Sequence, residues 1–274
     1  MANMKLAALD VDGTLVRSDL SLSPAVVAAV ESLRDAGVEV AVVTGRSLAE
    51  LKMFREKLPW IRYFVVSNGA TGYDTVRNEN FYENHLPLGI AQAIEREVRT
   101  YSVSNEIYAD GVAYVNRDCW MDAARYHTEY LHHPTLECGR SLVDNVGELL
   151  STRTTGIEKF YISFEHPDDL PKLESYCRQY PVDLVRSVQG GLEINQRGVE
   201  KGSGLAALCA YLQIDHAHVA AVGDGTADIA MFEQAALSIA MENASEHVRT
   251  SAMLVAPSND SDGVIWAIER IINA

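Results

Sequence analysis

The chain has 274 residues, of which 47% are hydrophobic, and its formal net charge is −15 at pH 7. A chain of this length and composition suits one large domain or two moderate ones with hydrophobic cores. The acidic balance argues against nucleic acid and anionic membranes as partners, because both demand a basic surface. It leaves room for a small phosphorylated substrate, because a local cation can invert the potential inside one cleft.

Targeting signals and disulfides are not expected either. The four cysteines, Cys119, Cys138, Cys177 and Cys209, form no CxxC pair and show no zinc-ligand spacing, which is typical of reduced, packed cysteines. The N-terminus lacks the long apolar stretch of a signal peptide, and no segment approaches the roughly 18 to 20 apolar residues of a membrane span. We therefore expect a soluble, cytoplasmic protein, either a monomer or a small homo-oligomer.

Strand and helix patterns alternate through the first third of the chain. Strands are predicted over residues 5–11, 38–46 and 63–70, and helices over 23–37 and 47–58. The first helix has Ser23 as a candidate N-cap, Pro24 at its first position and Gly37 as a stop. This rhythm predicts right-handed crossovers and a parallel sheet. The polar stretches "DVDGT", "TGRS" and "SNGA" would then gather at the carboxyl edge of that sheet, where such sheets bind ligands.

The pattern changes near residue 82, where helices mix with alternating strands such as 107–116 and 159–165. The alternating rhythm returns with a helix over 198–214 and a strand over 218–225. We therefore predict an α/β fold: a Rossmann-like parallel-sheet core formed by residues 1–82 and 191–274, with an inserted α+β cap domain over 83–190. Tyr108 and Tyr114, expected on one strand, and Lys159 on another are candidate substrate contacts in the cap, although they equally suit ordinary faces of a half-buried sheet.

Four polar signals suggest chemistry at the edge of the core sheet. Asp10 and Asp12 end an apolar strand, and in a continuing strand both would point to the same face; the alternative is an Asp-Gly turn. Thr44 ends the second strand, where a helix-capping hydroxyl is also common. Lys201 begins a helix, although the helix dipole disfavours a cation there.

The fourth signal is Asp224, which follows another apolar strand, with Asp228 four residues on; either suits an N-cap. Together, carboxylates, a hydroxyl and a lysine at the ends of parallel strands predict a site for a divalent cation and phosphate. Mg²⁺ favours a few carboxylates, water and phosphate oxygens, and it would make clustered aspartates tolerable.

The motifs "DVDGTL", "VVTGR", "GVEKGSGL" and "GDGTADIAMF", in this order, resemble the four motifs of the haloacid dehalogenase-like (HAD) superfamily of phosphohydrolases. The Cof-type branch, which includes many sugar-phosphate phosphatases, is also similar in "VSNGA", in "LEINQRGVEKG" and in the closing "IAMENASEHVRTSAMLVAPSNDSDGV". The likeness covers both flanks, whereas residues 83 to 190 match mainly as an α/β cap of suitable length and place.

The resemblance implies a Mg²⁺-dependent phosphatase that hydrolyses a small phosphorylated metabolite, such as a sugar phosphate, through an aspartyl-phosphate intermediate. Asp10 would be the nucleophile and Asp12 the acid and base, and Lys201 would neutralise phosphoryl charge while pairing with Asp10. The residues that would bind the phosphate or substrate are Thr44, Gly45, Arg46 and Asn68. The metal would be held by Asp10, the main-chain carbonyl of Asp12, Asp224 and Asp228.

Two departures from the branch pattern keep other functions open. Ala227 stands where the branch usually has asparagine, and Glu242 stands where it usually has glycine. Ala227 makes a catalytically weak phosphometabolite-binding protein one alternative to a phosphatase. A phosphomutase, which would return the phosphoryl group to the sugar rather than to water, is the other alternative. The physiological substrate is not encoded in any of these motifs.

Overall fold

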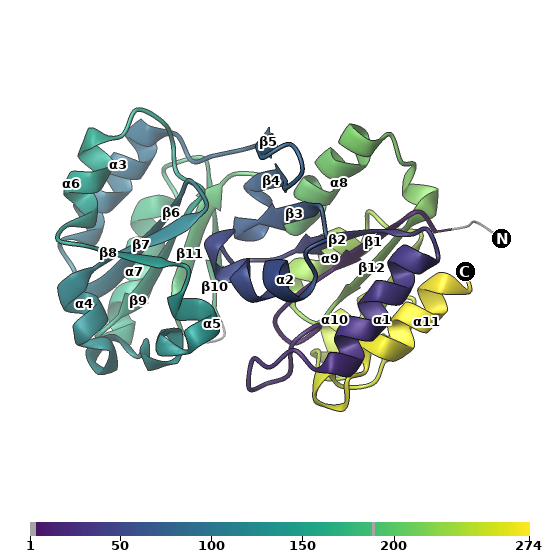
Figure 1. Ribbon diagram of the computed structural model, residues 1–274. Coiled ribbons are helices and arrows are strands. Elements are labelled where there is room, and N and C mark those ends of the chain that lie inside the picture. The colour runs from purple at the N-terminus through teal and green to yellow at the C-terminus, as the bar shows by residue number, and fades with distance from the viewer. Residues whose placement is uncertain (1–3, 188–189) are drawn as a thin grey trace. The chain divides into compact units, whose positions relative to one another are not determined.

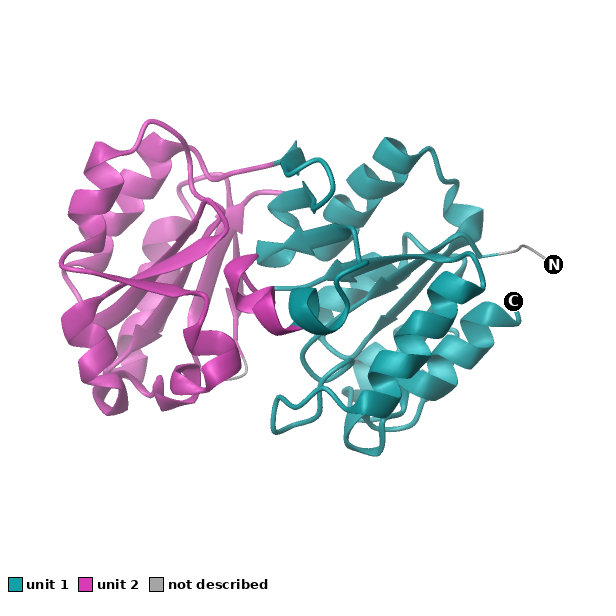
Figure 2. Ribbon diagram, viewed as in Figure 1, with its two compact units in different colours: residues 1–45, 54–83, 200–274 teal, residues 46–53, 84–199 magenta. Residues whose placement is uncertain are grey.

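A computed structural model describes residues 4–187 and 190–274 of the chain (Figure 1). The described chain divides into two compact units (Figure 2). Unit 1 comprises residues 1–45, 54–83 and 200–274, and unit 2 comprises residues 46–53 and 84–199. Relative to the sequence-based boundaries, unit 2 also takes in the segment 46–53 and the stretch 191–199.

Unit 1 is built on an eight-stranded sheet in the order β14-β13-β12-β1-β2-β3-β4-β5. The first six strands in this order pair in parallel, and the last two are antiparallel additions at the edge. The predicted parallel α/β core is confirmed. The strands are β1 (Leu6–Leu9), β2 (Glu39–Val43), β3 (Tyr63–Val66), β4 (Thr71–Asp74), β5 (Glu79–Glu83), β12 (Val219–Gly223), β13 (Leu237–Met241) and β14 (Leu254–Ala256).

Helices cover both faces of this sheet (Figure 1). Leu205 and Leu208 on one helix pack with Met231 and Phe232 on the next against one face of the central strands. The helices on this face are α8 (Lys201–Leu212), α9 (Ile229–Phe232) and α10 (Glu246–Ser251). Two further helices, α1 (Pro24–Asp35) and α11 (Val264–Ile272), pack side by side against the sheet.

Local sequence explains where these elements begin and end. Ser23 caps α1 by accepting a hydrogen bond from the amide of Val26, as predicted, and Gly37 follows the helix with a φ of +78°. The helix predicted over 47–58 is shorter and begins differently: a 3₁₀ turn over Ala49–Leu51 leads into α2 (Lys52–Lys57).

Unit 2 contains a six-stranded sheet in the order β10-β11-β9-β6-β7-β8, antiparallel except for the β7–β8 pair. One face is covered by α3, α6 and α7, whose apolar residues form a core with Ile107, Phe160 and Ile162. The elements are β6 (Val103–Ala109), β7 (Val112–Asn116), β8 (Arg140–Val143), β9 (Lys159–Phe164), β10 (Val182–Arg186), β11 (Leu192–Gln196), α3 (Leu88–Val98), α4 (Arg117–Met121), α5 (Pro134–Glu137), α6 (Val146–Thr152) and α7 (Leu170–Cys177).

The cap residues nominated from the sequence do not share one strand. Tyr108 lies on β6 and Tyr114 on β7, because a turn at Asp110 and Gly111 with positive φ at both residues separates the strands. The two rings belong to different clusters: Tyr108 packs with Trp120 and Tyr161, and Tyr114 packs against the helix-covered core. Expecting both on one strand was therefore wrong. Lys159 lies with its ammonium 4.6 Å from the centre of the Tyr108 ring.

No helix in residues 4–187 and 190–274 is long and apolar enough to cross a membrane.

A partly buried ion pair joins Arg62, just before β3, to Asp74 at the end of β4 in unit 1. Arg62 donates two hydrogen bonds to Asp74, at 2.8 and 2.6 Å, and the Asp74 side chain is fully buried. Tyr211 on α8 donates a third at 3.1 Å. The Arg62 hydrogen bonds hold the pKa of Asp74 well below its usual range despite burial. The ionised carboxylate is therefore part of the folded state.

We expect Asp74→Asn to lower the free energy of unfolding by about 3 kcal/mol at pH 7, because Arg62 loses a buried ionic partner. A carboxylate with a lowered pKa stabilises the fold above its unfolded-state pKa of about 3.9, and this stabilisation is lost as the pH falls below that value. The difference between parent and variant should therefore shrink below about pH 4. Urea titrations at several pH values measure it. Asp35→Asn, at an exposed ion pair, is the control and should change stability by less than about 0.5 kcal/mol.

Candidate active site

The candidate site lies where four neighbouring parallel strands of unit 1 end. β12, β1, β2 and β3 are adjacent in the sheet. The first residue after β12 is Asp224, after β1 it is Asp10, and after β2 it is Thr44. Because these strands are parallel, their carboxyl ends meet at one edge, and side chains distant in sequence converge there.

The Lys201 ammonium joins two of the carboxylates. Its Nζ lies 2.6 Å from Oδ1 of Asp10 and 2.6 Å from Oδ1 of Asp228. Asp10, Lys201 and Asp228 are all buried. The other oxygen of Asp228 accepts hydrogen bonds from the backbone amides of Asp224 and Gly225, at 2.9 and 2.8 Å. Asp228 therefore holds both the lysine and the loop that carries Asp224.

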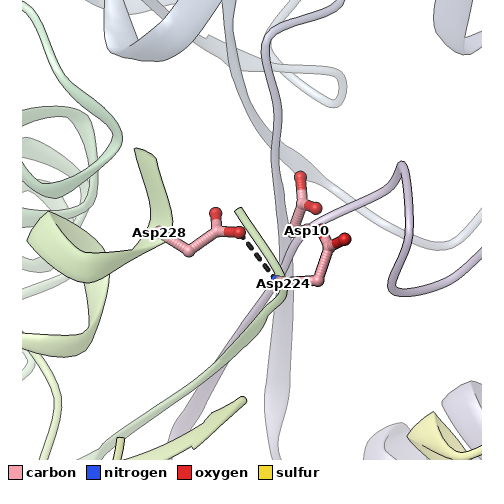
Figure 3. Close-up of side chains that lie close together, drawn as sticks. All are labelled: Asp10, Asp224 and Asp228. Atoms are coloured by element: carbon pink, nitrogen blue, oxygen red, sulfur yellow. Dashed lines mark hydrogen bonds between the residues drawn. The ribbon is translucent and has the colours of Figure 1, made fainter. Parts of the chain in front are cut away.

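Asp224 completes a cluster of three carboxylates (Figure 3). One oxygen from each of Asp10, Asp224 and Asp228 lies within 4.8 Å of the others. Asn243 donates from Nδ2 to the Asp224 carboxylate at 3.0 Å and to the Gly13 carbonyl at 2.9 Å. Gly13 has a φ of +75°, and a Cβ there would lie 2.1 Å from an Asp224 oxygen. Glycine is therefore required for the close approach of the two loops.

Asp12 does not stand beside Asp10 as two residues of one strand would. β1 ends at Leu9, and Asp12 lies in the following turn and is exposed, so the chain forms the alternative of a turn rather than a continuing strand. The turn arises because the backbone amides of Leu15 and Val16 both bond back to the Val11 carbonyl, which a strand does not allow. The charge of Asp12 still acts on Asp224, whose pKa it helps to raise.

The predicted phosphate-binding residues divide between the two units. Thr44 and Asn68 belong to unit 1, and the Asn68 amide donates to the Thr44 carbonyl at 3.1 Å. Gly69 follows with a φ of +99°, and a Cβ there would lie 2.2 Å from the Glu200 carbonyl, so this turn touches the start of α8. Gly45 is the last residue of its stretch of unit 1, and Arg46, which is buried, is the first residue of unit 2.

The site holds more carboxylates than positive charges, and burial and mutual repulsion raise the pKa values of two of these carboxylates, Asp10 and Asp224. Burial and the neighbouring Asp228 raise the pKa of Asp10 well above its usual range, and Lys201 opposes them. Burial and Asp228 raise the pKa of Asp224 to about 6. Burial alone would lower the pKa of Lys201, but Asp10 and Asp228 outweigh it and raise the pKa. One ammonium thus faces three carboxylates.

Comparison with known proteins agrees with this arrangement. Residues 7–268 match the family described as haloacid dehalogenase-like hydrolase. The chain belongs to this family. The 5-amino-6-(5-phospho-D-ribitylamino)uracil phosphatase YcsE of Bacillus subtilis is 26% identical over 271 residues, covering 98% of this chain and 96% of that protein.

Solved structures of haloacid dehalogenase-like proteins share the fold. One such hydrolase from Bacteroides thetaiotaomicron has a TM-score of 0.86 at 25% identity, covering 98% of this chain and 99% of that one. The subclass IIB sugar phosphatase BT4131 has a TM-score of 0.81 at 20% identity, covering 97% and 98%, and this likeness concerns the fold alone. The predicted family, fold class and phosphatase type of hydrolase are confirmed.

The acidic cluster of this haloacid dehalogenase-like hydrolase fits a hard divalent cation. Its donor set consists of carboxylate oxygens, which Mg²⁺ and Ca²⁺ favour over softer metals. Burial, and after it repulsion from Asp228, raises the pKa values of Asp10 and Asp224, and a cation placed among these oxygens would favour their ionised forms.

Sequence motifs pointed less clearly to two further residues of the hydrolase. Thr14 donates to Oδ2 of Asp10 at 3.4 Å, and Asn243 links Asp224 to Gly13. Thr14 belongs to "DVDGTL", but a hydroxyl after a glycine turn carries no signal of its own.

Ala227, the departure from the branch pattern, is exposed, and the Asp228 carboxylate beside it already holds Lys201 and two backbone amides.

In the absence of divalent ions, Lys201→Met should lower the free energy of unfolding by about 3 kcal/mol at pH 7, because it leaves buried carboxylates without their cation. The deficit should be smaller at pH 5, because protonation of Asp224, with a pKa of about 6, removes part of the repulsion. Urea unfolding in chelator at both pH values measures this. Lys172→Met, at an exposed i,i+3 pair, is the control. An equal deficit at both pH values would contradict this account of the site.

Proposed function

We propose that this hydrolase is a Mg²⁺-dependent phosphatase of small phosphorylated metabolites, sugar phosphates among them, acting through an aspartyl-phosphate on Asp10. The observation that carries the proposal is the buried Lys201 ammonium held at 2.6 Å from both Asp10 and Asp228, beside a third carboxylate. Membership of a hydrolase family and the phosphatase named among the relatives support the same chemistry.

In the first step, a carboxylate oxygen of Asp10 attacks phosphorus, and a new P–O bond forms as the bond to the substrate's alcohol oxygen breaks. The electron pair of that bond goes to the leaving oxygen, which takes a proton from Asp12. Asp12 is exposed, as a group that exchanges protons with substrate and water must be. Asp10 is held by Lys201 and Thr14, which fixes its direction of attack.

In the second step, water attacks the phosphorus of the aspartyl-phosphate while Asp12 accepts its proton. The P–O bond to Asp10 breaks, the carboxylate is restored and inorganic phosphate is the product. A carboxylate is a weak nucleophile, so positioning and charge neutralisation supply most of the rate. Lys201 supplies one fixed positive charge for the phosphoryl oxygens.

The residues that would hold Mg²⁺ are Asp10, Asp224 and Asp228, with the main-chain carbonyl of Asp12. A bound ion would supply positive charge that neutralises the phosphoryl oxygens beside Asp10. Asn243 holds the Asp224 carboxylate in place by its hydrogen bond at 3.0 Å.

Phosphate oxygens would be bound by the remaining polar groups at the strand ends. Thr44 offers a hydroxyl, Gly45 its backbone amide, and Asn68 its side-chain amide. Arg46, the next residue along the chain, would add a guanidinium, which suits phosphate because its donors match two oxygens at once. Because these groups would attract any small anion, phosphate release from an ester, rather than anion binding, tests their assignment to the substrate.

The substrate class follows from the chemistry of the site and the names of relatives. The relative from Bacillus subtilis is named for a phosphate ester on a ribityl chain, and BT4131 for sugar phosphates. Both are phosphate monoesters of polyhydroxylated carbon chains. A panel of sugar and polyol phosphates, with phosphate release as the readout, identifies the preferred member. Transfer of phosphate to a second sugar hydroxyl would indicate a mutase, and binding without turnover a sensor.

Asp10→Asn should abolish phosphate release from an aryl phosphate in Mg²⁺ while leaving the fold intact, because an amide cannot form the covalent intermediate. Thermal unfolding of both proteins checks the fold. Asp19→Asn, an exposed aspartate on the same segment, is the matched control and should retain full activity. Substantial turnover by pure Asp10→Asn protein would rule out the covalent mechanism.

Asp12→Ala should slow hydrolysis of a sugar phosphate by about 10²–10⁴-fold, the usual contribution of a general acid–base. The loss should be much smaller for an aryl phosphate, whose leaving group departs without a proton. Comparing kcat/KM for the two substrates tests this. Equal losses on both would remove Asp12 from the acid role.

Mg²⁺ should bind about tenfold more tightly at pH 7 than at pH 5. The pKa of Asp224 is raised to about 6, so a proton must leave before the metal can bind at the lower pH. Calorimetry of Mg²⁺ binding at both pH values, in buffers of different ionisation enthalpy, measures affinity and proton release. An affinity independent of pH would contradict metal binding at Asp224.

A further inference from the structure

Two asparagines of unit 1 hold the turn that carries Asp12. Nδ2 of Asn243 donates to the Gly13 carbonyl at 2.9 Å. Nδ2 of Asn259 donates to the Val16 carbonyl at 3.0 Å. Asp12 and Val16 also pair in an isolated β-bridge, so the beginning and the end of the turn lie side by side. The two side-chain amides therefore hold one compact turn at two of its carbonyls.

The two asparagines are also bonded to each other, and they are called the asparagine pair below. The backbone amide of Asn259 donates to Oδ1 of Asn243 at 3.1 Å. Nδ2 of Asn243 donates to the Asp224 carboxylate at 3.0 Å. Asn259 is 4% exposed, and its own Oδ1 accepts the Ser258 hydroxyl at 3.3 Å. A connected set of hydrogen bonds thus runs from the Val16 carbonyl to the Asp224 carboxylate.

The loop that supplies Asn259 is tightly closed. The backbone amides of Ser261 and Gly263 both donate to the Ser258 carbonyl, each at 3.0 Å. A Cβ on Gly263 would lie 1.9 Å from the Pro257 carbonyl oxygen, so glycine is needed where this loop enters α11. The buried side chain of Asn259 therefore gives the turn a fixed support.

The same loop also holds the segment after the turn through a separate contact. Arg17 donates to the two oxygens of Asp262, at 2.9 and 2.7 Å. The Ser23 hydroxyl donates to one of these oxygens at 3.0 Å. These bonds attach the segment to the loop without passing through the asparagine pair. Asp262 can therefore separate general attachment of the loop from the action of the pair.

We propose that Asn243 and Asn259 are positioning residues that set the preference of the site for Mg²⁺ over Ca²⁺. This inference rests on the proposed function, because it takes the Asp12 carbonyl and the Asp224 carboxylate to be metal ligands. The Gly13 carbonyl is the next one along the chain after that of Asp12, and a single nitrogen of Asn243 bonds both it and Asp224. One amide group thereby fixes the spacing of the two loops that carry these ligands.

Fixed loops favour the smaller ion. Mg²⁺ binds oxygens at about 2.0–2.1 Å in a nearly octahedral array, whereas Ca²⁺ binds them at about 2.3–2.6 Å in a more adaptable geometry. Loosening the asparagine pair should cost Mg²⁺ affinity, because the ligands lose their spacing. It should cost little Ca²⁺ affinity, because the larger ion accepts ligands that have moved apart. Hydrogen bonds that orient metal ligands typically contribute about 10–100-fold to metal affinity.

The test measures Mg²⁺ and Ca²⁺ binding by calorimetry for Asn259→Ala, Asn243→Ala and the control Asp262→Asn. Asparagine tolerates the φ of +54° at position 262, so the control removes the charge and keeps the backbone. For each asparagine variant we expect the dissociation constant of Mg²⁺ to rise about tenfold and that of Ca²⁺ to change less than about threefold. Both constants of the control should stay within about twofold of the parent.

A merely structural role would lower stability, measured by urea unfolding, without changing the ratio of the two dissociation constants. An unchanged ratio in the asparagine variants, or an equal change of the ratio in Asp262→Asn, would overturn the proposal. Asn243 is exposed, so Asn243→Ala keeps the test available if Asn259→Ala fails to fold.

Amide hydrogen exchange in chelator tests the positioning without any metal. In Asn259→Ala, the amides of Leu15 and Val16, which bond back to the Val11 carbonyl, should exchange about tenfold faster than in the parent. In Asp262→Asn they should stay within about twofold. Unchanged exchange in Asn259→Ala would overturn the proposal.

The parent protein separates this inference from the proposed function. A parent that binds neither ion would contradict both. A parent that binds Mg²⁺, with variants that keep its ratio of Ca²⁺ to Mg²⁺ dissociation constants, would contradict this inference alone.

Discussion

The site depends on one ammonium group that stands between two buried carboxylates. Lys201 lies at the first turn of α8, where the helix dipole disfavours a cation. Its ammonium is stable there because Asp10 and Asp228 each accept a hydrogen bond from it at 2.6 Å. Asp228 in turn accepts the amides of the loop that carries Asp224. The lysine thus connects the nucleophile candidate to the metal-binding candidates, and the negative charge that it leaves uncompensated would favour a bound cation.

Parallel strands are what bring these groups together. Asp10 and Lys201 are separated by 191 positions in sequence, yet β1 and β12 lie side by side and α8 runs back across the sheet. The loops must then approach closely, which explains the two glycines with positive φ at the contact points. Gly13 admits the Asp224 carboxylate, and Gly69 admits the backbone of Glu200. Glycine is therefore needed at both positions, because a side chain there would push apart the loops that carry the site residues.

The sequence by itself determined the fold class, the family and the order of the motifs, because apolar periodicity and short-range spacing are local properties. It also predicted the Ser23 cap, since a cap depends on neighbours within one turn. Tertiary structure alone decided that β1 ends before Asp12, that Tyr108 and Tyr114 lie on separate strands, and that Asn243 holds Asp224. It also assigned Glu50 to Arg140, 90 positions away, because such a pairing follows from how strands and loops pack in space.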